Sequence, residues 1–152
     1  MALKSFFMAI IFCAIAAFAC PKNSLAQTSD DPADTVQLIY NTEDKEHSAR
    51  LWSPRMKALW VKQDSLEYGV AALDFDYKSD SQDPGVRDLK IAVIHKLDTD
   101  AEVRVTFNEY GDSFEMRYDL VRYNEAWVID DVRKVKGPNE LWVLSEILKR
   151  NK

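Results

Sequence analysis

An alternation of apolar and polar residues runs through positions 89–129 and constrains the fold more than any other feature of the sequence. Short polar connections at residues 98–100, 109–112 and 124–125 divide this stretch into four segments. A period of two residues is typical of strands with one covered face, and short connections join antiparallel neighbours. The sequence therefore predicts a four-stranded antiparallel meander.

Helix signals flank the predicted sheet. Asp31-Pro32 and Ser53-Pro54 each combine an N-cap residue with a first-turn proline, and apolar residues follow at helical spacing. The first helix is expected to run for about 15 residues. Gly137-Pro138 is expected to end the sheet and open a last helix, with apolar residues at 141, 144 and 148 on one face. Residues 31–152 should thus form a single α+β domain, with helices packed on one face of a curled antiparallel sheet.

The acidic composition of the chain bears on which kinds of partner it can bind. The chain has 152 residues, with 20 Lys and Arg against 25 Asp and Glu, a net charge of −5. With 47% hydrophobic residues and only 4 Gly and 5 Pro, this is the composition of an ordinary globular domain. An acidic chain repels phosphate groups on average, so we expect no nucleic-acid partner and favour neutral or cationic ones.

The first residues are typical of a secretory signal peptide. No charged residue lies between Lys4 and Lys22, and the apolar run of residues 6–19 is shorter than a membrane-spanning helix needs. Ser24-Leu25-Ala26 presents small residues to a signal peptidase, which predicts a signal peptide at 1–26 and a linker at 27–30. The protein is therefore expected to be exported, to the periplasm or the medium, with no transmembrane helix in the mature chain.

A lipoprotein signal is the alternative for the same segment. Ala17-Phe18-Ala19-Cys20 resembles a bacterial lipobox, in which a lipid is attached to Cys20, although a lipobox usually has Leu where this chain has Ala17. Lipidation of Cys20 is the one route by which we expect membrane attachment. Cleavage before Gln27 would instead leave a mature chain without cysteine, since Cys13 and Cys20 both lie upstream.

The segment from Leu73 to Asp83 carries the most information about family. It reads LDFD followed by QD at Gln82-Asp83, and it precedes a meander with AEVRVTF at 101–107 and AWVIDDV at 126–132. These elements resemble the domain-of-unknown-function 3828 family of secreted bacterial proteins and lipoproteins, over about residues 33–148. The resemblance implies a nuclear transport factor 2-like, or cystatin-like, fold, whose sheet curls around a cone-shaped cavity. It implies no activity, and Pro84-Gly85 stands where the family tends to have an aromatic residue.

Carboxylates in the same segment are candidate ligand-binding groups. Asp74 and Asp76 lie two residues apart, so on a strand they would share one side, and two close carboxylates can raise one pKa toward a working acid or base. Short acidic side chains also accept backbone hydrogen bonds and hold loops in shape. The same two readings apply to Asp80, Gln82 and Asp83.

No cofactor or metal is expected from the motifs. With Asp74 as the first residue of a calcium loop, Lys78 would stand at a ligand position and Gly85 in place of the bidentate Glu. The two histidines lack metal-ligand spacing, and no phosphate-binding or dinucleotide-binding loop occurs.

Two further candidates lie in the meander. His95 shares the alternation of its strand, which would turn it toward the covered face and any cavity there. Trp127 and Ile129 occupy the apolar positions of the last strand, so Trp127 is expected to anchor the core. The same alternation turns Asp131 inward unless a bulge intervenes.

The leading functional hypothesis is a non-enzymatic binding or accessory module for a small ligand or a protein. The alternative is a small hydrolase or isomerase with an acid/base group from Asp74, Asp76, His95 or Asp131 in the sheet cavity. A third class, a secreted inhibitor or immunity-type partner, would present an acidic or aromatic surface patch instead of a cavity.

Overall fold

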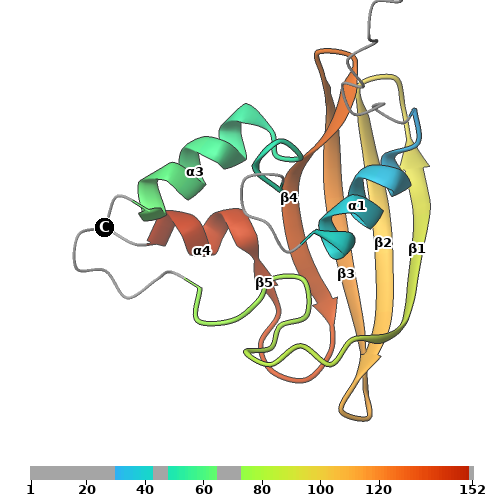
Figure 1. Ribbon diagram of the computed structural model, residues 1–152, viewed down its shortest axis with the longest axis vertical. Coiled ribbons are helices and arrows are strands. Elements are labelled where there is room, and N and C mark those ends of the chain that lie inside the picture. The colour runs from blue at the N-terminus through green and yellow to red at the C-terminus, as the bar shows by residue number, and fades with distance from the viewer. Residues whose placement is uncertain (1–29, 43–47, 65–72, 151–152) are drawn as a thin grey trace, which may run out of the picture.

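The computed structural model describes residues 30–42, 48–64 and 73–150 (Figure 1). Its centre is a five-stranded antiparallel sheet in which each strand pairs with the next along the chain. The strands are β1 (Arg87–Lys96), β2 (Asp100–Glu109), β3 (Asp112–Tyr123), β4 (Ala126–Lys136) and β5 (Trp142–Val143). The predicted four-stranded meander is confirmed, and β5 extends it.

Two-residue turns set the register of the central hairpins. Tyr110 and Gly111 join β2 to β3 with φ of 50° and 95°, and Asn124 and Glu125 join β3 to β4 with φ of 50° and 66°. Positive φ at both turn residues matches the right-handed twist of the flanking strands. Gly and Asn adopt this conformation readily, which is why these short polar connections close the hairpins tightly.

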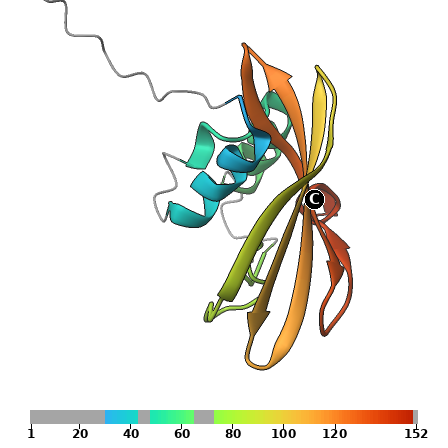
Figure 2. The same cartoon turned by 90° about the vertical axis from the view of Figure 1, so that its right-hand side faces the viewer.

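One face of the sheet forms the core and is covered by helices. Helix α1 (Pro32–Asn41) lies across this face and contributes the fully buried Val36 and Ile39 (Figures 1 and 2). Its first turn is capped by Asp31, whose carboxylate accepts a hydrogen bond from the Ala33 amide at 2.9 Å. The buried hydrophobic residues of β2 and β3 are Ala101, Val103, Val105, Phe107, Phe114, Met116, Tyr118 and Leu120.

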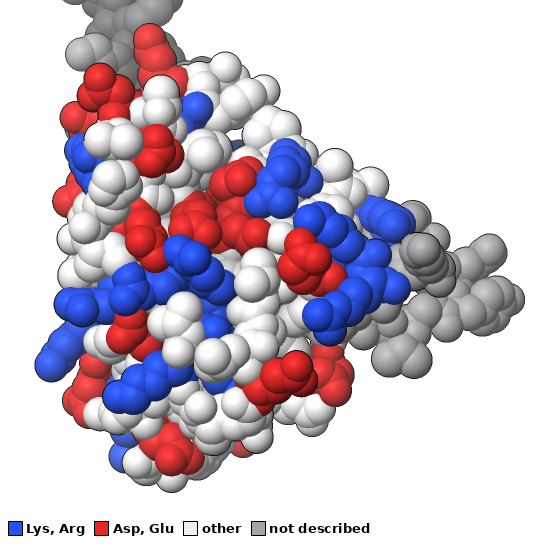
Figure 3. Space-filling model, turned by 180° about the vertical axis from the view of Figure 1, so that it is seen from behind, with Lys and Arg blue, Asp and Glu red and all other residues white. Residues whose placement is uncertain are grey.

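The opposite face of the sheet is charged. Figure 3 shows acidic and basic side chains intermixed on the side of the molecule turned away from the view of Figure 1. Arg117 lies 2.5 Å from Glu115, and Arg133 lies 2.6 Å from Glu102 and 3.0 Å from Asp119. Mutual pairing of this kind makes the outer face a solvated surface with balanced charge.

Two helices differ from their sequence signals. Helix α1 has 10 residues, fewer than the roughly 15 expected, while α3 spans Pro54–Asp64 and begins at its expected proline. The last helix, α4 (Leu144–Arg150), begins six residues after Pro138, because Trp142 and Val143 pair with Lys134 and Arg133 of β4. Leu144 and Leu148 face the core as expected, whereas Leu141 is 57% exposed and lies outside the helix. Pairing with an open strand edge thus overrides the local helix signal.

The outer edge of β4 is covered in two parts. Trp52 forms a parallel bridge with Ile129, through hydrogen bonds of 2.8 Å from Ser53 N–H to the Ile129 carbonyl and 2.7 Å from Ile129 N–H to the Leu51 carbonyl. Further along, β5 covers the same edge. Between these parts the register shifts, so that Asp119 faces Asp131 while Leu120 faces Ile129, and Asp130 is the extra residue of a bulge.

No helix within the described ranges is long and apolar enough to cross a membrane. The predicted signal peptide, the linker up to residue 29 and Cys20 lie outside the described residues.

Candidate functional site

The segment that carries LDFD and QD folds into a compact loop. Asp76 N–H donates to the Ser81 carbonyl at 2.9 Å, and the Asp76 carboxylate accepts from the Lys78 amide at 2.9 Å. The Asp76 carbonyl accepts from the amides of Ser79 and Asp80 as well. The expectation that Asp74 and Asp76 share one side of a strand was therefore wrong, because the side chain of Asp76 closes a turn instead.

The exit of this loop is tied to the β2–β3 hairpin. The Gly85 amide donates to the carboxylate of Glu109 at 2.6 Å, and the Tyr110 hydroxyl donates to the Asp83 carbonyl at 2.7 Å. Glu109 is buried although it is charged. A Cβ at Gly85 would lie 3.4 Å from the ring of Tyr110, which is an ordinary van der Waals contact.

Asp76 and Asp83 differ in what their carboxylates do, and this difference can be measured. We expect Asp76→Ala to lower the free energy of unfolding by about 1–2 kcal/mol, because the Lys78 amide loses its acceptor. Within the described part of the chain, the Asp83 carboxylate forms no hydrogen bond, so Asp83→Ala should change stability by less than about 0.5 kcal/mol. Urea denaturation of both variants tests this, and equal losses would contradict it.

Asp74 and Gln82 are exposed and line a pocket of about 420 Å³. Its apolar wall includes Phe75 and Trp142, whose ring centroids are 5.4 Å apart. The remaining charged lining residues are Asp80, Glu140 and Arg150. This Phe75–Trp142 pocket thus holds two of the predicted residues, in an open setting between the loop and the β5–α4 segment.

A buried ion pair that the sequence reading missed lies beside this pocket. Lys134 Nζ is 2.5 Å from the carboxylate of Asp80, with the two side chains 0% and 8% exposed. The other Asp80 oxygen accepts from the Trp142 indole N–H at 2.6 Å, and Lys134 also donates to the Pro138 carbonyl. The alternation of apolar residues along β4 does not by itself predict that Lys134 is buried. The bulge shifts the alternation and puts Lys134 on the buried side of β4.

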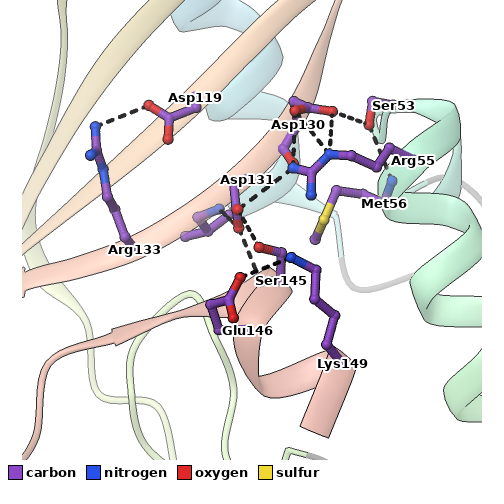
Figure 4. A network of polar contacts seen from close by, with 11 residues as sticks. Ser53, Arg55, Met56, Asp119, Asp130, Asp131, Arg133, Ser145, Glu146 and Lys149 are labelled. Atoms are coloured by element: carbon purple, nitrogen blue, oxygen red, sulfur yellow. Dashed lines mark hydrogen bonds and ion pairs between the residues drawn. The ribbon is translucent and has the colours of Figure 1, made fainter.

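The bulge in β4 forms a polar junction with the helices (Figure 4). The Asp130 carboxylate accepts from the Ser53 hydroxyl at 2.6 Å and from the guanidinium of Arg55 at 2.9–3.2 Å. Burial opposes ionisation of Asp130, but the hydrogen bonds from Arg55 and Ser53 outweigh it and hold the pKa of this carboxyl below its ordinary value. Asp130 therefore fastens the start of α3 to the sheet.

The Asp131 side chain binds the first turn of helix α4. Its carboxylate accepts from the Ser145 amide at 3.1 Å and the Ser145 hydroxyl at 2.5 Å, which caps the first turn of α4. Because the bulge intervenes, Asp131 lies opposite Asp119 and does not follow Trp127 and Ile129 into the core. The inward alternative for Asp131 was therefore wrong, for the reason that the sequence analysis named.

His95 does not face the covered side of the sheet. Its side chain is 53% exposed, and its Nε2 lies 3.7 Å from the carboxylate of Asp100. The register of β1 against β2 shifts between Val93 and His95, which breaks the alternation on which the expectation depended. As β1 is also the edge strand, His95 lies at the surface.

The predicted residues are thus spread over several places. Asp76 closes a turn, Asp74 and Gln82 line the Phe75–Trp142 pocket, Asp131 caps α4 and His95 lies on the edge strand. Asp83 contributes only backbone groups. In the described ranges, no group of three or more His, Cys, Asp and Glu residues is arranged to hold a metal ion.

A more enclosed and more apolar site lies between α3, the preceding turn and the loop. We call it the aromatic pocket; it has a volume of about 400 Å³ and is lined by Ser48, Ala49, Trp52, Lys57, Trp60, Val61 and Tyr77. The ring centroids of Trp52, Trp60 and Tyr77 lie 5.4–5.9 Å from one another. Their edge-to-face and tilted packing makes a firm apolar wall.

Three different constraints position the wall of the aromatic pocket. The bridge to Ile129 holds Trp52, α3 carries Trp60, and the turn closed by Asp76 places Tyr77. Burial, with Asp76 and Tyr40 adding to it, raises the pKa of Tyr77 above its ordinary value, so its hydroxyl stays neutral. The sequence analysis missed this site, because no local pattern shows that Tyr77 approaches the two tryptophans.

One charged group of the aromatic pocket has no protein partner in the described part of the chain. The Lys57 ammonium forms no hydrogen bond or ion pair with any described residue, although its side chain is half-buried. The indole nitrogen of Trp60 also lacks a partner there, but it is buried and does not open into the pocket. An apolar wall with a few polar groups is the usual composition of a small-molecule site.

Comparison with known proteins adds no relative to these observations. No protein-family model, no curated protein and no solved structure matches the chain.

Proposed function

We propose that this protein is an exported, non-catalytic module that binds a small, largely apolar ligand in the aromatic pocket. One observation carries the proposal: a concave site of about 400 Å³, walled by Trp52, Trp60 and Tyr77, is present beside the core. Its volume lies within the range typical of small-molecule sites, roughly 300–1,000 Å³, and its lining is mostly apolar as in such sites.

The distribution of titratable groups favours binding over catalysis. A hydrolase or isomerase needs an acid and a base within reach of one reacting atom. The candidate groups instead lie in a turn, at a helix cap, on an edge strand and in a separate open pocket. Asp76 and Asp131 accept hydrogen bonds from the protein's own backbone or hydroxyl groups, as structural carboxylates do.

Export is supported by the first residues of the sequence. The uncharged apolar run at 6–19 and Ser24-Leu25-Ala26 favour a cleaved signal peptide, with lipidation of Cys20 as the alternative. Loss of Lys4 and Lys22 with the leader would take the net charge from −5 to −7. We place the mature protein in the periplasm or the medium.

The fold is compatible with the family resemblance. Helices cover one face of a twisted antiparallel sheet, and the segment with LDFD and QD packs between the helices and the meander. We propose that the domain is a nuclear transport factor 2-like, or cystatin-like, relative of the domain-of-unknown-function 3828 family. In this proposal the ligand site lies at the side of the sheet, since Tyr118, Met116 and Ile39 fill its inner face.

Titration with N-phenyl-1-naphthylamine, a neutral apolar dye, tests the proposed function. We expect saturable fluorescence enhancement by the protein and loss of at least about tenfold in affinity in Val61→Glu, which brings a charge into the apolar pocket. Val61 is 66% exposed on α3, so the fold should tolerate the change.

Leu38→Glu is the matched control, because Leu38 is an exposed apolar residue of another helix, α1, and does not line the pocket. Equal dye affinity in both variants would place the dye elsewhere, and absence of saturable binding to the parent protein would overturn the proposal.

A further inference from the structure

We infer that the ligand of the aromatic pocket is an amphiphile with an anionic end, such as a carboxylate on an apolar body, and that Lys57 binds this end. The inference rests on the proposed function and names the chemical class of its ligand. Two features of the pocket support it: a partly buried cation without a carboxylate partner among the described residues, and a lining that is otherwise apolar or uncharged.

Lys57 is partly buried, and the other buried or partly buried cations of the described structure are paired with carboxylates. Arg55 is paired with Asp130, Lys78 lies 3.5 Å from Asp76, and Lys134 lies 2.5 Å from Asp80. Lys57 lines the aromatic pocket, and its ammonium has no such partner among residues 30–42, 48–64 and 73–150. An ammonium group offers three hydrogen-bond donors and no acceptor, so a ligand that satisfies it must bring acceptors.

Lys57 is the one charged side chain among the described residues that line the aromatic pocket. Asp76, which precedes the lining residue Tyr77, is engaged by the Lys78 amide and ammonium. The charge that a ligand meets in the pocket is therefore positive, although the whole chain has a net charge of −5.

Trp60 contributes an apolar ring face to the site and no accessible donor. Its indole nitrogen has no partner in the described structure, but it is buried and does not open into the pocket. Lys57 and Trp60 lie three residues apart on α3, so they are neighbours on the helix surface. A ligand whose apolar body packs on the Trp60 ring can therefore bring its anionic end to the Lys57 ammonium.

A cationic ligand fits the pocket less well. Aromatic sites hold cations when ring faces surround the charge. Here Trp52, Trp60 and Tyr77 pack against one another with interplanar angles of 50–67°, and Lys57 stands in the same wall. The like charge of Lys57 would repel a quaternary ammonium group.

Displacement of bound N-phenyl-1-naphthylamine by three ten-carbon probes, all below their micelle concentrations, tests the inference. We expect decanoate to bind more tightly than 1-decanol, and decyltrimethylammonium to bind most weakly. Lys57→Gln should weaken decanoate about fivefold to tenfold and leave 1-decanol unchanged, because only the charged end loses its partner.

Lys62→Gln is the matched control, since it removes the same charge from the same helix at a residue that does not line the pocket. Equal affinities for decanoate and 1-decanol, or equal effects of the two lysine substitutions, would overturn the inference and leave the apolar pocket intact. Failure of all three probes and the dye to bind would instead contradict the proposed function.

Sedimentation with vesicles of anionic phospholipid separates a free amphiphile from a membrane headgroup as the source of the charge. We expect the protein to remain in the supernatant while it binds decanoate in solution, because the site is a pocket beside the core. Pelleting of the parent protein that is lost in Lys57→Gln would overturn the assignment to a free molecule.

Discussion

Replacement of Lys134 by Met is expected to lower the free energy of unfolding by about 3–5 kcal/mol. The substitution removes the cation of a pair in which Lys134 is 0% and Asp80 8% exposed. The carboxylate of Asp80 would then remain desolvated, with the Trp142 indole N–H as its remaining hydrogen-bond donor. An unpaired buried charge is far more costly than the pair itself is stabilising, so the loss should be large.

Asp80→Asn in the same background provides the control. Asp80 has φ of 64°, a conformation that Asn adopts readily, so this change removes charge without backbone strain. We expect the Lys134→Met/Asp80→Asn double variant to be more stable than Lys134→Met alone. Urea denaturation of the single and double variants measures both effects. A double variant that is less stable than either single variant would show that loss of Lys134 does not leave the Asp80 carboxylate as a costly unpaired charge.

Trp127→Ala is expected to reduce the free energy of unfolding by a similar amount, about 3–5 kcal/mol. The prediction that Trp127 anchors the core is confirmed by its 3% exposure. Its indole N–H donates to the Asp30 carbonyl at 3.1 Å, and the guanidinium of Arg122 lies 4.7 Å from the ring centroid. Truncation removes the packing, the hydrogen bond and the cation–π contact together.

Trp127→Phe separates these contributions, because it keeps an aromatic ring and removes the N–H donor. We expect it to be clearly more stable than Trp127→Ala, as judged by thermal melting and urea denaturation. The Thr35 hydroxyl donates to the Trp127 carbonyl at 3.2 Å, so the backbone link to α1 is kept in both variants. A melting temperature of Trp127→Ala within a degree or two of the parent would be incompatible with a core anchor.

The open edge of β4 links the stability of this fold to its candidate sites. On the N-terminal side of the bulge, Ile129 of β4 pairs with Trp52, which forms part of the aromatic pocket. On its C-terminal side, Lys134 of β4 pairs with Trp142, which lines the Phe75–Trp142 pocket. At the bulge, Asp130 and Asp131 hold α3 and α4 through Arg55 and Ser145. Changes at the bulge are therefore expected to disturb both pockets together.

The sequence by itself determined the features that depend on local pattern. Alternation of apolar residues specified the meander, because each strand can bury one face at one parity only. The short polar connections at 109–112 and 124–125 indicated hairpins, and Gly111 and Asn124 within them adopt positive φ. Asp31-Pro32 specified the start of α1 through a side-chain cap that acts within three residues.

The tertiary structure decided the features that depend on strand edges and on segments distant in sequence. The bulge at Asp130 reversed the alternation of inward and outward side chains along β4 after Ile129. As a result, Asp131 faces α4 and Lys134 lies in the interior. A shift in β1 left His95 at the surface. The aromatic pocket formed because a turn in one segment brought Tyr77 against two tryptophans of another. Periodicity reports only one element at a time, whereas bulges, edge pairing and contacts between segments are set by the free energy of the whole packed domain.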